Sequence, residues 1–184
     1  MSPRLRFSTV DDLYEAFPTA LSDVGAPADG RSSLDFARAL LREGALRGAL
    51  SFCAYLLPRY DAVAWGCACL RADAMDGASA AEEAALRAAE AWTRAPEEAR
   101  RAAALDLAER SNRLMPATWM ALAAGRAGGQ MSADGEHFAP TPAQATAQAT
   151  RVALILAAGR AGFSGRNALM ADWIEAGLSR AAAS

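Results

Sequence analysis

The sequence predicts an all-α protein: a single all-helical domain over residues 1–184, folded as an irregular bundle of about eight or nine helices. The apolar content is mostly Ala, the best helix former, and larger apolar side chains recur with helical spacing. Helix-start signals recur along the chain, and no segment shows a convincing strand pattern. Because Ala lets helices approach closely, we expect a tightly packed core with little aromatic mass.

Local signals place the elements of the first half. The expected elements are a helix over 8–16, a Gly-, Pro- and Asp-rich loop over 22–30, and helices over 33–43, 45–57 and 58–74. Ser32 or Ser33 can cap the second of these helices, because a serine oxygen accepts from the free amides of the first turn. Gly44 separates the second helix from the third, and Pro58 ends the third or opens the fourth.

The second half begins with the clearest signal. Ser79 and Glu82 form a capping box, in which each side chain accepts from the other residue's amide. Pro96, followed by two glutamates, is typical of a helix start, and Thr141 with Gln144 gives a second capping box. The expected elements are helices over 79–94, 96–111, 116–127, 141–158 and 167–180, an irregular stretch over 130–140 and a turn over 159–165.

One helix is expected to be central. Its large apolar residues surround the helix axis, which is typical of a helix buried on all sides. These residues are Val152, Leu154, Ile155 and Leu156.

Two internal echoes leave an alternative fold open, a short helical-repeat array. The heptapeptide Leu-Ala-Ala-Gly-Arg-Ala-Gly occurs at 122–128 and again at 156–162, and Trp65, Trp92 and Trp119 are evenly spaced. The residues around the tryptophans do not otherwise align, so we favour the irregular bundle, with all four tryptophans, Trp173 included, in its core.

The composition restricts which partners and which cellular compartment we expect. The formal net charge is −2, and the arginines are interleaved with acids, so we expect no nucleic-acid binding. The longest apolar runs, such as 152–158, fall far short of the roughly 20 residues of a membrane span. The first residues contain no apolar run that could act as a secretory signal, so we expect none. Three cysteines leave one unpaired in any disulfide scheme. We expect a cytoplasmic protein with no membrane partner.

The reactive residue types show no catalytic pattern. Cys67 and Cys69 point in different directions on a helix, so with Cys53 they are expected to be buried thiols. His137, the only histidine, lies in the stretch expected to be irregular. The carboxylate pairs stand in first turns of helices, where the helix dipole explains them. We therefore expect no catalytic residue, no metal site and no cofactor.

An ordered series of Trp, Pro, Arg and Gly residues resembles an uncharacterised family of small bacterial proteins, a domain of unknown function. The series comprises Leu57-Pro58-Arg59, Ala64-Trp65, Ala91-Trp92, Pro96, Arg100-Arg101-Ala102, Pro116, Trp119, Gly128-Gly129 and the Pro140 loop. It covers 57–160, and relatives have a Trp pair at 64–65 and Ser-Gly-Gly at 127–129. The resemblance implies an association with type VI secretion gene clusters and an accessory role.

We therefore expect a non-enzymatic protein-interaction module, an adaptor, chaperone or accessory factor of a secretion system. Its partner is expected to be another protein, with homo-oligomerisation left open. The expected interaction surface comprises Arg100, Arg101, Gly128, Gly129, His137 and Pro140. Arg101→Glu is expected to weaken partner capture without unfolding the domain.

Two alternatives stay open. One is a helical small-molecule sensor or regulator, although the N-terminal segment lacks the basic helix-turn-helix of such proteins. The other is an enzyme that uses His137 or a carboxylate pair.

Overall fold

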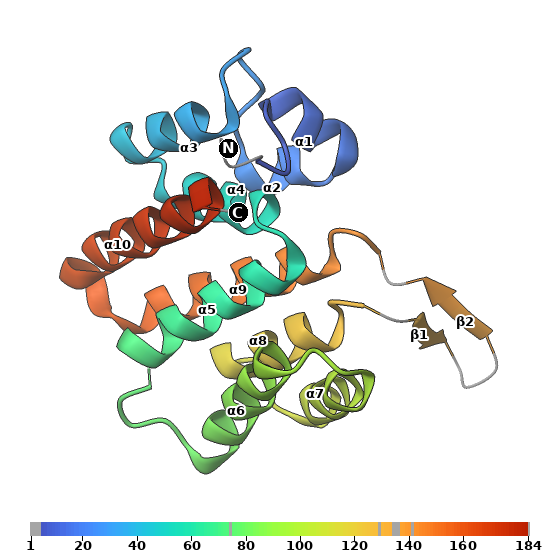
Figure 1. The fold of residues 1–184 in the computed structure, drawn as a ribbon. Coiled ribbons are helices and arrows are strands. Elements are labelled where there is room, and N and C mark those ends of the chain that lie inside the picture. The colour runs from blue at the N-terminus through green and yellow to red at the C-terminus, as the bar shows by residue number, and fades with distance from the viewer. Residues whose placement is uncertain (1–4, 74, 129, 134–136, 141, 184) are drawn as a thin grey trace.

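The chain folds into a bundle of helices from which one hairpin projects (Figure 1). The computed structural model describes residues 5–73, 75–128, 130–133, 137–140 and 142–183. The first helices are α1 (Val10–Ala16), α2 (Ala20–Val24), α3 (Ser33–Arg42), α4 (Leu46–Leu56) and α5 (Arg59–Asp73). They are followed by α6 (Ala80–Arg94), α7 (Glu98–Arg110), α8 (Pro116–Gly125), β1 (Gln130–Ala133), β2 (His137–Pro140), α9 (Ala145–Arg160) and α10 (Gly162–Ala183). With ten helices in the described residues, the predicted all-α bundle is confirmed.

Two elements were not predicted. The helix α2 is only five residues long, too short for a hydrophobic period to be visible in the sequence. The hairpin occupies the stretch expected to be irregular, with antiparallel pairs from Gln130 and Pro140 to Ala133 and His137. Its sequence signal is Asp-Gly at 134–135, the dipeptide most typical of a hairpin turn, and this signal was missed.

The observed helix boundaries show which of the predicted helix starts are correct. The capping box of α6 forms as predicted, with the amides of Ser79 and Glu82 each donating to the other side chain at 3.3 Å. The helix expected to begin at residue 141 begins instead at Ala145, where Gln144 provides no side-chain cap. Residue 141 of the expected capping box lies outside the described residues. The last helix begins at Gly162, earlier than expected, so the turn between α9 and α10 is short.

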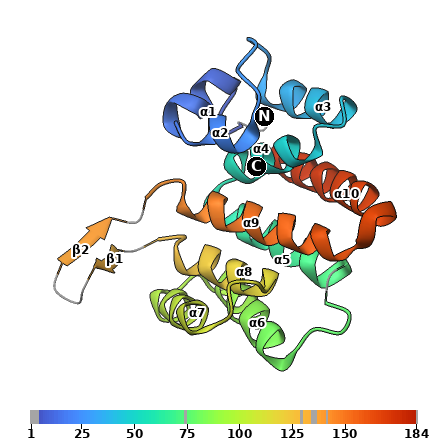
Figure 2. The same ribbon diagram turned by 180° about the vertical axis from the view of Figure 1, so that it is seen from behind.

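The bundle has two groups of helices, and α5 and α9 join them (Figures 1 and 2). In one group, α4 contacts α2, α3 and α10. In the other, α8 contacts α6 and α7. Both α5 and α9 contact α8 and α10, and α9 also contacts α4. The prediction that the helix after the hairpin is central is confirmed by these contacts.

The side chains that bury α9 differ from those expected. Of its large apolar residues only Leu154 is fully buried, whereas Val152, Ile155 and Leu156 are partly exposed. The other buried positions carry small residues: Ala145, Thr146, Ala147, Ala149, Thr150, Ala153, Ala157 and Ala158. A helix surrounded by large side chains appears instead in α4, where every residue from Gly48 to Leu56 is buried.

Three of the four tryptophans are core residues, as predicted. Trp65, Trp92 and Trp173 are at most 7% exposed, whereas Trp119 is partly exposed. The indole of Trp65 donates to the carbonyl of Trp173 at 2.9 Å, and that of Trp173 to Asp73 at 2.9 Å. The evenly spaced tryptophans therefore occupy dissimilar environments, which a regular repeat would not produce.

Glycines provide the closest helix contacts. A Cβ on Gly125 would lie 2.7 Å from the backbone of Leu105 in α7, and one on Gly48 would lie 2.6 Å from the carbonyl oxygen of Val24 in α2. Because backbone atoms cannot turn aside as a side chain can, both contacts require glycine. The identical heptapeptide in α9 places Gly159 where a Cβ would meet nothing within 4 Å.

We predict opposite effects for the same substitution in the two copies of the heptapeptide. Gly125→Ala should lower the free energy of unfolding by about 1–3 kcal/mol, because α7 must move away from α8. Gly159→Ala should leave stability unchanged or raise it by up to about 1 kcal/mol, because Ala has the higher helix propensity. Urea unfolding followed by circular dichroism measures both, and equal changes would contradict the packing described for Gly125.

Candidate functional site

The two arginines of the expected surface hold helices together. Arg101 is only 8% exposed. Its guanidinium donates to the carbonyl of Gly125 at the end of α8 (2.5 Å) and to the carboxylate of Glu98 (2.7 and 2.5 Å). Arg100 is exposed and donates to the carbonyl of Ala91 in α6 (3.0 Å). We therefore correct the expectation that Arg101→Glu leaves the fold intact, because it would put a buried carboxylate against a carbonyl oxygen.

The remaining residues of that surface lie around the hairpin. Gly128 follows α8 and packs near Arg101, whose Cδ is 3.9 Å from where a Cβ of Gly128 would be. His137 and Pro140 are the first and last residues of β2, whose strand projects from the helical body (Figure 2). Gly129 lies outside the described residues. The structure thus brings Arg101 and Gly128 together, but at a buried helix junction.

The cysteines are buried and inert. All three are free and at most 5% exposed, as predicted. Burial raises the pKa of Cys53 and of Cys69 to about 12, and it also raises the pKa of Cys67. Because the thiolate is the reactive form, none of these thiols is a nucleophile near neutral pH.

In the described residues, no three His, Cys, Asp or Glu side chains are grouped so that they could hold a metal ion. Every helix in this part of the chain is too short or too polar to span a bilayer.

A partly buried polar cluster anchors α2 to α4 and α9. Asp23 accepts from the Tyr55 hydroxyl (2.5 Å) and pairs with Arg151 (3.1 Å), which also donates to the Ser51 hydroxyl (3.2 Å). Burial, together with the bond to Asp23, raises the pKa of Tyr55 to about 12, so the phenol remains a donor. Each group is matched within the cluster, and we therefore assign it a role in holding the helices together.

An aromatic and cationic surface patch lies along α8, with Arg113 and Leu114 before the first residue of the helix and Arg126 after the last. We name it the Trp119 patch, and it consists of Arg113, Leu114, Trp119 and Arg126. Leu114 is 76% exposed, the largest exposed fraction of any large apolar residue in the described chain. The Arg113 guanidinium carbon lies 5.5 Å from the centroid of the Trp119 ring, whose indole donates to the carbonyl of Arg113 (2.7 Å).

The positive charge of this patch is only partly compensated. In the described residues, Arg113 has no carboxylate partner, whereas the nearby Arg110 pairs with Asp106. Burial, and after it the charge of Arg113, lower the pKa of Arg126, and the charge of Glu109 opposes them. The Arg113 guanidinium therefore lies over a partly exposed aromatic ring, and the charge of Arg113 also acts on Arg126.

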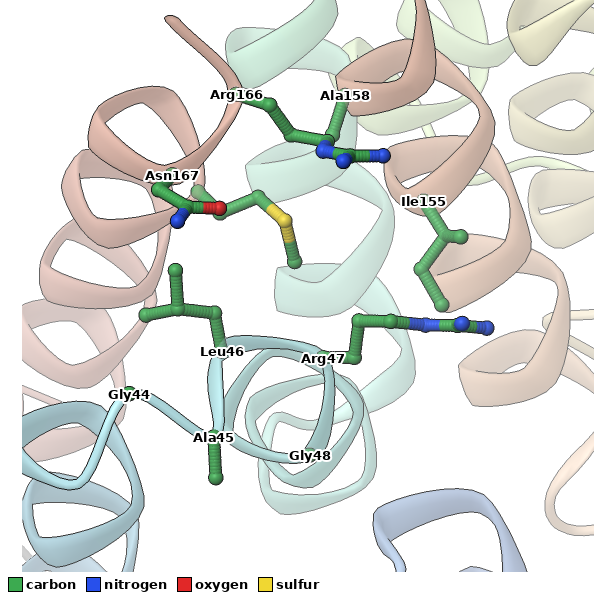
Figure 3. A pocket seen from close by; sticks show the side chains of 10 residues that line it. Gly44, Ala45, Leu46, Arg47, Gly48, Ile155, Ala158, Arg166 and Asn167 are labelled. Carbon is green, nitrogen blue, oxygen red and sulfur yellow. The ribbon is translucent and has the colours of Figure 1, made fainter. Parts of the chain in front are cut away.

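A cleft of about 550 Å³ opens between the start of α4, the C-terminal half of α9 and the start of α10 (Figure 3). Its charged residues are Arg47 and Arg166, whose side chains extend in the same direction on either side of Ile155. Asn167 adds an amide, and the apolar lining comes from Leu46, Ile155, Ala158 and Met170. None of the residues that line the cleft is acidic.

Sequence reasoning missed both surfaces. Leu114 is an apolar residue in the polar segment before Pro116, and Arg47 stands in a first helical turn, where an acid is favoured. Both residues depart from the local pattern, and this departure can be seen in the sequence. The position of Arg166 beside Arg47 cannot be seen there, because more than a hundred residues separate them in the chain.

The comparisons with known proteins give one match. The model of a family described as "Family of unknown function (DUF6931)" matches residues 36–181. The match includes the 57–160 segment on which the resemblance was based, so the expected relation to an uncharacterised family is confirmed. No curated protein and no solved structure matches the chain.

We predict that Arg101 contributes to stability and Arg100 much less. Arg101→Gln should lower the free energy of unfolding by about 1–3 kcal/mol, because it leaves the Gly125 carbonyl without its donor. Arg100→Gln, at an exposed position, should change it by less than about 1 kcal/mol. Chemical denaturation of the two variants tests this, and equal stability of both would show that the buried bonds of Arg101 contribute nothing.

The thiols should react only when the chain unfolds. With the pKa of Cys53 and Cys69 raised to about 12, the thiolate fraction in the folded protein stays negligible across the neutral and mildly alkaline range. A disulfide reagent such as DTNB should label none of the three in native buffer and all three in guanidinium. Fast labelling of any thiol in native protein would show that its environment is open.

Proposed function

The chain belongs to the family of unknown function DUF6931, and we propose that it acts as a non-enzymatic protein-interaction module, an adaptor, chaperone or accessory factor. The observation that carries the proposal is the Trp119 patch, where a 76% exposed Leu114 stands beside a partly exposed tryptophan. The cysteines are buried in the core, and carboxylates such as Glu82 and Asp61 are paired with arginines. The Trp119 patch is more distinctive than either group because it is exposed.

The composition of the patch is that of a protein interface. Trp and Arg are the residues most enriched among those that dominate binding energy, and they act where a partner excludes water. The Trp119 ring is already fixed by its bond to the carbonyl of Arg113 and by the guanidinium beside it. A ring held in place before binding loses little conformational freedom when a partner packs on it.

The charge of the patch specifies the partner. Arg113 and Arg126 offer two guanidinium groups, and an acidic segment would relieve their mutual repulsion. Leu114 offers an apolar contact of its own. We therefore propose a partner segment that combines carboxylates with an apolar or aromatic side chain.

The hairpin supplies a second contact region after α8. It is a two-stranded sheet, so in the described residues each strand has one edge without a neighbouring strand. An extended partner segment can add a strand to such an edge. His137 and Pro140, predicted to belong to the interaction surface, lie in β2. We propose that their backbone groups take part in pairing with such a segment.

The family resemblance also suggests where in the cell the protein acts and with which machinery. We propose that the module works in the bacterial cytoplasm as an accessory of a secretion system. The three free cysteines support a reducing compartment, because a disulfide would be expected in an oxidising one.

One observation favours a second candidate function, a small-molecule sensor. The cleft between α4, α9 and α10 is of the size that small ligands occupy, and it lies on elements remote in sequence from the Trp119 patch.

The adaptor proposal predicts that partner capture depends on Leu114. A photo-crosslinking residue at position 114 should capture a partner in cells of the source organism, and the same residue at the matched exposed Leu21 of α2 should not. With the purified partner, Leu114→Asp and Arg113→Glu should each weaken binding roughly tenfold or more. Because both positions are exposed, stability should stay within about 0.5 kcal/mol of the wild type.

The matched control for Leu114 is Leu21. Leu21→Asp introduces the same charge at another exposed leucine and should leave affinity unchanged. Raising the salt concentration should weaken binding, because the guanidinium contacts are screened. Unchanged affinity in Leu114→Asp and Arg113→Glu would overturn the proposal, as would cross-linking only to a second copy of this chain.

A further inference from the structure

We propose that the cleft between α4, α9 and α10 binds a small amphipathic organic anion, in which a carboxylate or phosphate head group is attached to an apolar body. The inference is independent of the Trp119 patch, since the cleft is built from other helices. It rests on the charge, the lining and the size of the cleft (Figure 3).

The charge of the cleft is positive and local. Arg47 and Arg166 come from two different helices, and their side chains extend in the same direction on either side of Ile155 (Figure 3). No carboxylate lines the cleft, and Arg47 makes no ion pair with any described residue. Two guanidinium groups in one concave site are suited to the planar or tetrahedral oxygens of a carboxylate or phosphate.

The start of α4 adds to this charge. Its first-turn amides have no intrahelical acceptor, its N-cap residue Ala45 provides no side-chain acceptor, and no acid stands in the first turn. Gly44, with a φ of 76°, makes the left-handed turn that leads from α3 into α4. The positive end of the α4 dipole therefore acts on the same cleft as the two arginines.

The apolar lining specifies the rest of the ligand. Leu46 and Ile155 lie on opposite sides of the cleft, and Met170 also lines it, so an anion without an apolar part would leave this apolar lining without a partner. Asn167, which also lines the cleft, offers an amide that can donate or accept a hydrogen bond. These groups fit a molecule with one charged end and one apolar end.

The size of the cleft favours a small molecule over a protein segment. About 550 Å³ lies within the range of roughly 300–1,000 Å³ that small-molecule sites occupy. A stable protein interface takes about 800 Å² from each partner, far more than this one cleft provides. We therefore assign it to a ligand of about the size of a short-chain acyl or aromatic carboxylate.

The test uses four defined probes and the full chain. Octanoate and octyl phosphate carry both the head group and the apolar body, octyl glucoside lacks the charge, and inorganic phosphate lacks the apolar body. Binding is measured by calorimetry and by NMR shifts of the Gly44, Gly48 and Asn167 amides. We expect saturable binding of one or both octyl anions, weakened by salt, with little or no binding of the other two probes.

Variants assign the binding to the arginines. Arg47→Gln and Arg166→Gln should each raise the Kd of the octyl anion roughly tenfold. Arg94→Gln is the matched control, because Arg94 is also an exposed arginine on a helix and lies far from the cleft residues in sequence. Leu114→Asp should leave this binding unchanged, so failure of the adaptor proposal and failure of this inference are distinguishable.

Each remaining outcome is decisive. The difference between octanoate and octyl phosphate identifies the head group that the arginines prefer, and either preference supports the inference. Equal binding of octyl glucoside, unchanged affinity in both arginine variants, or no saturable binding of either octyl anion at millimolar concentration would overturn it. Because Arg47 is exposed, a loss of fold cannot account for a loss of binding in Arg47→Gln.

Discussion

The close approach of α8 and α9 through small side chains is the contact on which the rest of the fold depends. α8 is buried at all its positions except Trp119, largely through Ala, and α9 is buried mainly through Ala and Thr. Such surfaces bring helix axes close together, so the dispersion contacts are made between backbones and methyl groups. Where α7 meets the end of α8, even a methyl group is excluded, and Gly125 is required. The two largest fully buried side chains, Tyr55 and Phe52, lie instead in α4.

The arginines, which replace lysine entirely in this chain, include two contrasting kinds. Several tie distant helices together, as when Arg160 of α9 pairs with the buried Glu82 of α6 (2.6 Å) and Arg180 of α10 with Asp61 of α5 (2.9 Å). Arg47 and Arg113 make no such pairs with described residues and stand beside exposed apolar groups. A cation that does not serve the fold and that borders an apolar surface is suited to binding, which is why both proposals begin from these arginines.

The repeated heptapeptide shows how far local sequence determines structure. Both copies end a helix, as their Gly and Arg predict, at Gly125 in α8 and at Arg160 in α9. Beyond that they diverge: the glycine of the first copy contacts a neighbouring backbone, and Gly159 of the second faces open space. The same seven residues thus end a helix in both places but differ in where the helix ends and in how the glycine packs.

The sequence by itself determined the fold class, most helix positions and the burial of the cysteines, because capping serines, prolines and helical periodicity act within one or two turns. It did not determine α2, which is too short to show a period, or that the buried face of α9 carries small residues. Only the tertiary structure decided that Arg101 is buried and that Arg47 and Arg166 line one cleft. Burial and convergence depend on which helices meet, and residues far apart in the chain carry no local signal of that meeting.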